Sequence, residues 1–66
     1  MDKMEFAARI SWALETAVDE GIVSGVMTVE NLMANKDEIL RCEFDEDEID
    51  ELDESLVKSV FKSWVN

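Results

Sequence analysis

The residues best suited to chemistry or binding are nine carboxylates within twelve positions, residues 43–54. Carboxylates at this density can bind divalent cations, act as acids or bases, or attract a positively charged surface. On a helix, twelve residues rise about 18 Å, which gives about one charge per 2 Å. Duplex DNA carries one charge per about 1.7 Å of its axis, so such a helix face could imitate a phosphate backbone. A solvated acidic helix start is the simpler interpretation of the same residues.

Neither metal binding nor catalysis fits the pattern of this acidic run. An EF-hand loop beginning at Asp45 has Asp47 at its third position, but Ile49 and Asp50 occupy the fifth and sixth positions, where an acid and a glycine are needed. Acid–base catalysis needs a desolvated pocket that raises one carboxyl pKa, and a chain of 66 residues has little room for one. The chain also has no histidine and only one cysteine. We therefore expect no enzyme activity, no specific metal site and no cofactor.

Attraction of a basic surface is the remaining chemistry, and it defines the candidate partner-binding residues. These are seven acids of the run and one tryptophan: Asp45, Asp47, Glu48, Asp50, Glu51, Asp53, Glu54 and Trp12. On a helical wheel, Trp12 lies about 160° from the apolar stripe of the first expected helix. Tryptophan is enriched at binding hot spots, so we expect Trp12 to anchor a partner or a second copy of the chain. An isolated tryptophan without a role, or one covered by the chain ends, is the alternative.

Composition limits the classes of partner. Seventeen acids and six bases give a net charge of −11, so DNA, RNA and anionic membranes repel the chain. We therefore expect a basic protein partner, no direct nucleic-acid binding and no membrane binding. No run of 18 apolar residues is present, and the first residues lack the basic start and apolar stretch of a signal peptide. We expect a cytoplasmic location, with which a lone Cys42 is compatible.

The elements that must position these residues are predicted to be helices within one domain, residues 1–66. An apolar fraction of 47%, no proline and only two glycines favour an all-α fold. Apolar residues recur at helical spacing in three segments. We predict a small three-helix bundle with helices over residues 3–20, 28–41 and 46–65.

Helix-end signals support two of these boundaries. Gly21 is a natural stop for the first helix, since glycine accepts the left-handed conformation without steric cost. Asp45 and Glu48 have the capping-box spacing at the start of the third helix. Near its end, Phe61 and Trp64 continue the apolar stripe, and we expect both to pack in the core.

The middle of the chain allows alternatives. A capping-box spacing that begins at Asn35 favours a break in the second helix near that residue. A strand over residues 40–44 is a second alternative, although one strand alone cannot satisfy its backbone groups. In the connection after the first helix, we expect Ile22, Val23 and Val26 to pack inward.

Two functions from different classes follow from these features. The first is a binding protein that docks its acidic helix face onto a basic partner, and so inhibits or regulates a nucleic-acid-binding protein. The second is a self-assembling structural module, because a 66-residue chain has a thin core and a homodimer would bury more apolar surface. In size and charge the chain resembles small, acidic, mostly helical proteins of phages and mobile elements that block nucleic-acid-binding proteins, although no motif is shared residue by residue. This resemblance implies a DNA-mimic-like inhibitor.

Overall fold

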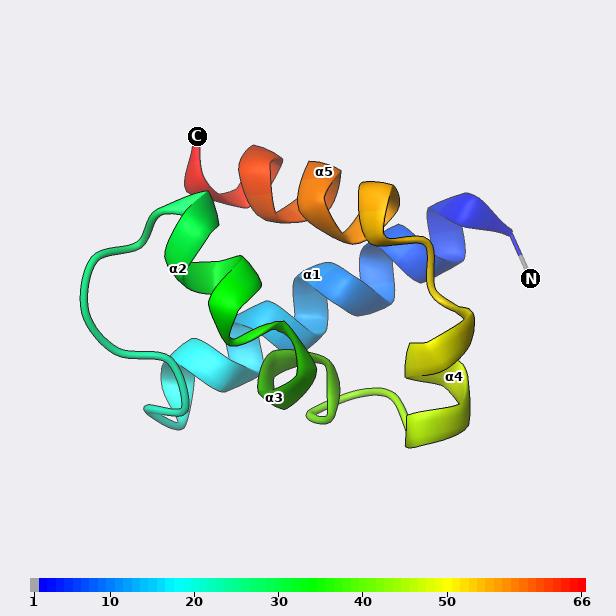
Figure 1. Ribbon diagram of the computed structural model, residues 1–66, viewed down its shortest axis with the longest axis horizontal. Helices are drawn as coiled ribbons and strands as arrows, with labels where there is room; N and C mark the ends of the chain where they lie inside the picture. The colour runs from blue at the N-terminus through cyan, green and yellow to red at the C-terminus, as the bar shows by residue number, and fades with distance from the viewer. Residues whose placement is uncertain (1) are drawn as a thin grey trace.

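A computed structural model describes residues 2–66, which form five helices and no strand. The helices are α1 (Lys3–Asp19), α2 (Val29–Ala34), α3 (Lys36–Leu40), α4 (Glu46–Glu51) and α5 (Glu54–Val65). The two long helices, α1 and α5, pack against each other and run in the same general direction, while the three short helices complete the molecule (Figure 1). The predicted all-α fold is confirmed.

The second predicted helix, over residues 28–41, breaks where the capping signal indicated. α2 ends at Ala34 and α3 begins at Lys36, with Asn35 between them. The Asn35 side chain does not cap α3, and instead its amide donates to the carbonyl oxygen of Asn31 at 2.9 Å. The alternative with a break near residue 35 is therefore confirmed, and residues 40–44 form no strand.

The third predicted helix, over residues 46–65, is also two helices, so the prediction of one uninterrupted helix was wrong. Leu52 and Asp53 have extended backbone, with ψ angles of 137° and 119°. The Asp53 side chain accepts a hydrogen bond from the N–H of Ser55 at 2.9 Å, so it caps α5. A capping aspartate has a non-helical backbone, and for this reason the helix starts again at Glu54.

The connection after α1 begins with the predicted glycine stop. Gly21 has a φ of 72°, and the N–H of Ile22 donates to the carbonyl oxygen of Ala17 at 2.9 Å, as in a Schellman motif. From this turn the connection loops away from the helices before it returns to α2 (Figure 1). Only Val23 is buried, whereas Ile22 is 38% exposed and Val26 is 74% exposed. The expectation that all three pack inward was therefore wrong for Ile22 and Val26.

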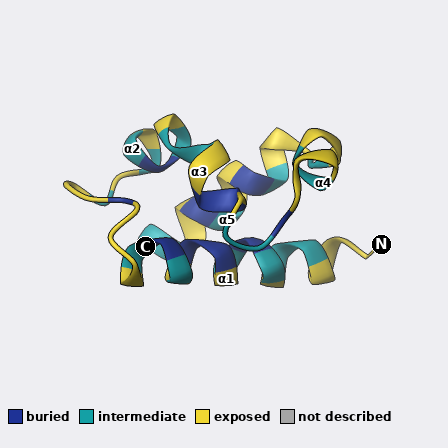
Figure 2. Ribbon diagram, turned by 90° about the horizontal axis from the view of Figure 1, so that it is seen from below, coloured by how far each residue is buried: buried dark blue, intermediate teal, exposed yellow. Residues whose placement is uncertain are grey.

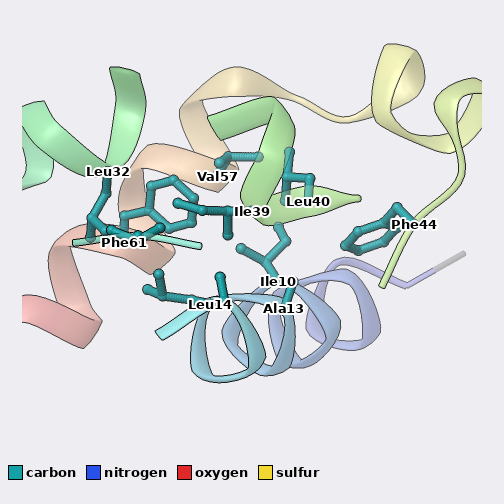
Figure 3. Close-up of a cluster of buried hydrophobic side chains, with 11 residues drawn as sticks. Ile10, Ala13, Leu14, Leu32, Ile39, Leu40, Phe44, Val57 and Phe61 are labelled. Carbon is teal, nitrogen blue, oxygen red and sulfur yellow. The ribbon is translucent and has the colours of Figure 1, made fainter. Parts of the chain in front are cut away.

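One cluster of buried apolar side chains holds the helices together, and Figure 3 shows members of this cluster pointing toward one another. The buried residues are Ile10, Ala13, Leu14, Ala17, Val23, Leu32, Ile39, Leu40, Phe44, Val57 and Phe61. Burial of each large side chain contributes about 1.5–3 kcal/mol. The closely packed helix pairs are α1–α5, α1–α3, α2–α5 and α2–α3, and within residues 2–66 α4 belongs to none of them. The core therefore depends on α1, α2, α3 and α5.

Candidate protein-interaction surface

α4 carries the densest part of the acidic run. Its sequence, EDEIDE, contains five acids in six residues. The predicted capping box is confirmed at its start: the N–H of Glu48 donates to Asp45 Oδ1 at 3.0 Å, and the N–H of Asp45 donates to Glu48 Oε1 at 3.3 Å. Acids in the first turn also interact favourably with the helix dipole. Local capping and charge thus explain why such an acidic segment is helical.

Four acids of α4 form one solvent-facing strip, which we call the acidic edge: Glu46, Asp47, Asp50 and Glu51. All four are exposed, and they lie on the side of α4 away from the half-buried Ile49. Six helical residues rise about 9 Å, so the four acids of this edge give about one charge per 2.2 Å. The charge density expected from the sequence is therefore present, although over a shorter helix.

Most carboxylates of the acidic edge lack a counter-charge within residues 2–66. Glu46 Oε1 lies 3.6 Å from Arg41 Nη2. Asp47, Asp50 and Glu51 form no ion pair or side-chain hydrogen bond within residues 2–66. Glu46 with Asp50, and Asp47 with Glu51, are like-charge pairs at i,i+4 spacing, which weaken a helix. The acidic edge is thus an open, self-repelling charged surface.

Three of the seven candidate acids lie in the acidic edge, which also includes Glu46, and the remaining four candidates are engaged within the chain. Asp45 and Asp53 cap the starts of α4 and α5. Glu54 Oε1 lies 3.9 Å from Lys36 Nζ, and Glu48 forms both the capping box and an ion pair with α1. The structure therefore divides the candidate acids into those that build the helices and those that only face solvent.

Arg9 of α1 fixes the acidic segment to the core. Its Nη1 donates to Glu48 Oε2 at 2.9 Å, its Nε donates to Glu43 Oε1 at 3.4 Å, and its Nη2 donates to the Glu43 carbonyl oxygen at 3.2 Å. The Arg9 guanidinium also stacks 4.2 Å from the ring centroid of the buried Phe44. The hydrogen bond from Arg9, helped by the backbone N–H of Asp45, lowers the pKa of Glu48. α4 is therefore held to α1 by charge, in addition to the packing of Ile49 against the core.

Sequence reasoning did not identify Arg9 as the residue that positions α4. The composition contained one signal. Because the chain has seventeen acids and only six bases, a base at the edge of an apolar helix stripe is expected to form ion pairs with acids. Which acids it meets is set by tertiary packing, because Glu43 and Glu48 lie 34 and 39 residues further along the chain.

Trp12 lies on the outer side of α1, where the helical wheel placed it, and its side chain is 65% exposed. Figure 2 shows α1 along one side of the molecule, with α2, α3 and α4 on its other side. A shallow hollow of about 410 Å³ beside the tryptophan is lined by Glu5, Ala8, Arg9 and Trp12. The candidate acids and Trp12 thus lie on different helices, and Arg9 lies between them.

The remaining residues singled out in the sequence are buried or half-buried in the fold. Phe61 is fully buried, and Trp64 is half-buried against the core, as expected. Cys42 is half-buried, with its Sγ 3.8 Å from the Glu38 carbonyl oxygen. Burial raises the pKa of the Cys42 thiol, which disfavours a reactive thiolate.

No protein-family model matches this chain, and comparisons with curated proteins and with solved structures gave no match either. None of the helices within residues 2–66 combines the length and apolar character needed to cross a membrane. The same residues contain no group of three or more acidic or cysteine side chains that could hold a metal ion. The functional interpretation therefore depends on the acidic edge and on the outer side of α1.

Proposed function

We propose that this protein binds a basic surface of another protein through the acidic edge. The observation that carries the proposal is a row of four exposed carboxylates on one side of α4, three of them without a counter-charge within residues 2–66. Uncompensated charges of one sign create a local potential that attracts an opposite surface and steers its approach. The partner is therefore a protein with a lysine- or arginine-rich surface.

The energetics of α4 support a binding role for Asp50 and Glu51 over a stabilising one, because acids in the last turn oppose the helix dipole, whereas Glu46 and Asp47 in the first turn favour it. α4 buries no residue, so the acidic edge covers none of the core. Each like-charge i,i+4 pair costs about 0.2–0.5 kcal/mol of helix stability. Surface features that oppose folding are typical of sites selected for function.

The charge spacing supports the further proposal that the partner is a nucleic-acid-binding protein. About one charge per 2.2 Å along the acidic edge is near the value of about 1.7 Å for duplex DNA. A basic surface that accepts phosphates would therefore also accept this helix. Occupation of that surface would inhibit or regulate the partner by excluding its nucleic acid.

A capture experiment with two matched variants tests the binding proposal. The probe is the heparin-retained fraction of a lysate of the native cell, because that fraction is enriched in basic nucleic-acid-binding proteins. The edge variant neutralises three unpaired acids of α4 with near-isosteric amides, D47N/D50N/E51Q. The control variant neutralises three exposed acids near the end of α1, E15Q/D19N/E20Q. Both variants change the net charge equally, so they separate the acidic edge from bulk acidity.

We expect the wild type and the control variant to capture the same basic protein at low salt and to release it at high salt. The edge variant is expected to capture much less of it. Equal capture by the edge variant and the wild type would contradict the proposal. Addition of the wild type to the captured protein bound to labelled duplex DNA then tests occlusion: release of the DNA is expected, and retained DNA would reject mimicry.

A further inference from the structure

The outer side of α1 carries an uncovered apolar row that the acidic edge does not use. Met4 is 79% exposed and Trp12 is 65% exposed, and the exposed Ala8 lies midway between them. Spacing of i, i+4 and i+8 places these side chains in one ridge along the helix. We call this row, Met4, Ala8 and Trp12, the α1 stripe. Large apolar side chains gathered on a surface are typical of an interaction site.

The α1 stripe is continuous with an uncharged groove between α1 and α5. The groove has a volume of about 480 Å³, and its lining consists of alanines and serines together with Leu56, Val60 and Trp64. Ala8 lines both this groove and the hollow beside Trp12. In a chain whose residues are 35% charged, an uncharged surface of this extent is unusual.

The charges near the α1 stripe favour a second copy of the chain over a basic partner. Residues 3–14 contain Lys3, Arg9 and a single acid, Glu5, whereas residues 43–54 contain nine acids and no base. A basic protein is attracted to the acidic edge and gains little from this part of α1. Counting Glu43 and Glu48, which pair with Arg9, the surroundings of the α1 stripe hold three acids and two bases, so two copies that meet here bring little excess negative charge into contact.

The geometry of the α1 stripe is complementary to itself. When the i±4 ridges of two helices interdigitate, the helix axes cross at about −50°. An antiparallel crossing with a two-fold axis next to Ala8 places Met4 of each copy against Trp12 of the other. Methionine and aromatic rings make favourable contacts, and the small Ala8 allows the two helices to approach closely. The same arrangement brings Glu5 of one copy within a helical turn of Arg9 of the other.

We infer that the α1 stripe is a homodimer interface, in which α1 of one copy crosses α1 of the other. A standard interface buries about 800 Å² per partner, which is about a fifth of the 4389 Å² that this chain exposes. Three side chains and the adjoining groove supply only part of that area. The dimer is therefore weak, and its population rises and falls with protein concentration. Because each copy carries a charge of −11, added salt strengthens the dimer, whereas it weakens binding at the acidic edge.

Sedimentation equilibrium of the purified protein over a range of concentration and salt tests this interface. A8E places two like charges against each other at the two-fold axis, and A34E introduces the same charge at an exposed alanine on α2. We expect the mass of the wild type and of A34E to rise toward two chains with concentration and with salt. A8E is expected to remain a single chain.

Disulfide cross-linking in a C42S background tests the predicted register. The two thiols of A8C would lie at the two-fold axis, within the distance of about 7 Å between Cα atoms that a disulfide requires. The two thiols of E15C, on the same helix, would lie about 21 Å apart along the axis. We expect oxidation to join two chains of A8C/C42S and to leave E15C/C42S as single chains.

Three results would overturn the homodimer: a wild-type mass of one chain at every concentration, association of A8E equal to that of the wild type, or no cross-link with A8C/C42S. Loss of captured basic protein in W12A, with a monomeric wild type, would assign the stripe to that partner instead. The edge variant D47N/D50N/E51Q separates the two proposals, since it should lose the basic partner and still dimerise.

Discussion

α4 and α5 follow one another in the chain, yet only α5 contributes fully buried side chains to the core. α5 buries Val57 and Phe61 and packs against α1 and α2, whereas α4 buries no residue and is held by the Arg9–Glu48 ion pair. The charges differ as well: Lys62 in the last turn of α5 complements the helix dipole, while the last turn of α4 is acidic. Folding thus depends on α5, and the exposed acids of α4 are available for binding.

The largest expected effect is the loss of a core side chain from α5. Phe61→Ala removes a fully buried ring and should cost about 3–5 kcal/mol, a large part of the stability of a small domain. Ile49→Ala on α4 removes a half-buried side chain and should cost clearly less. Urea unfolding followed by circular dichroism measures both, and equal losses would show that α4 is as much a part of the core as α5.

A smaller effect is expected where the two helices separate. Asp53→Ala removes the side chain that accepts the N–H of Ser55, and loss of an N-cap costs about 1 kcal/mol. Asp50→Ala removes an exposed acid of α4 whose side chain caps no helix, so it serves as the control and should not destabilise. Thermal unfolding compares them, and an unchanged midpoint for Asp53→Ala would mean that the helix break has another cause.

The separation of α4 from α5 also shows what the sequence could and could not predict. Capping signals predicted the start at Asp45, and helical periodicity predicted the burial of Phe61 and placed Trp12 away from the apolar stripe of its helix. The same periodicity continues through Leu52, so it cannot distinguish one long helix from two. The cap at Asp53 decides between them, because its side chain competes with helical continuation for backbone hydrogen bonds.

The sequence could not predict the long-range contacts, for a different reason. The Arg9 ion pairs join α1 to residues more than thirty positions away, and no local pattern specifies them. They divide the candidate acids, because Glu48 is bound to Arg9 while Asp47, Asp50 and Glu51 face solvent. Composition singled out the acidic run only as a whole, and packing determines which of its members face solvent.

Lowering the pH should weaken the Arg9–Glu48 ion pair that attaches α4 to α1. The pKa of Glu48 is lowered in the folded protein from its ordinary value of 4.5, chiefly by the hydrogen bond from Arg9. Its stabilising effect is therefore fully present above about pH 4.5 and is lost as the pH falls through the lower folded pKa. We expect the melting temperature of the wild type to fall more than that of Glu48→Gln over this range. Parallel curves would contradict a stabilising Arg9–Glu48 pair, and Glu51→Gln is the control.

The smallest expected effect on stability has the opposite sign. The edge variant D47N/D50N/E51Q relieves like-charge repulsion on α4 and should raise stability by a few tenths of a kcal/mol. Added salt should stabilise the wild type by screening the same repulsion, and should stabilise the edge variant less. Thermal unfolding at two salt concentrations provides the comparison, and a destabilised edge variant would indicate that these acids support the fold.

The most direct test of the acidic edge is the affinity of the captured basic protein for three versions of this chain, measured by calorimetry at low salt. We predict that the edge variant D47N/D50N/E51Q loses at least about tenfold in affinity, or about 1.4 kcal/mol, while the control variant E15Q/D19N/E20Q binds as the wild type does. Equal losses in both variants would mean that net charge alone attracts the partner. Unchanged affinity in the edge variant would contradict the acidic edge as the binding surface.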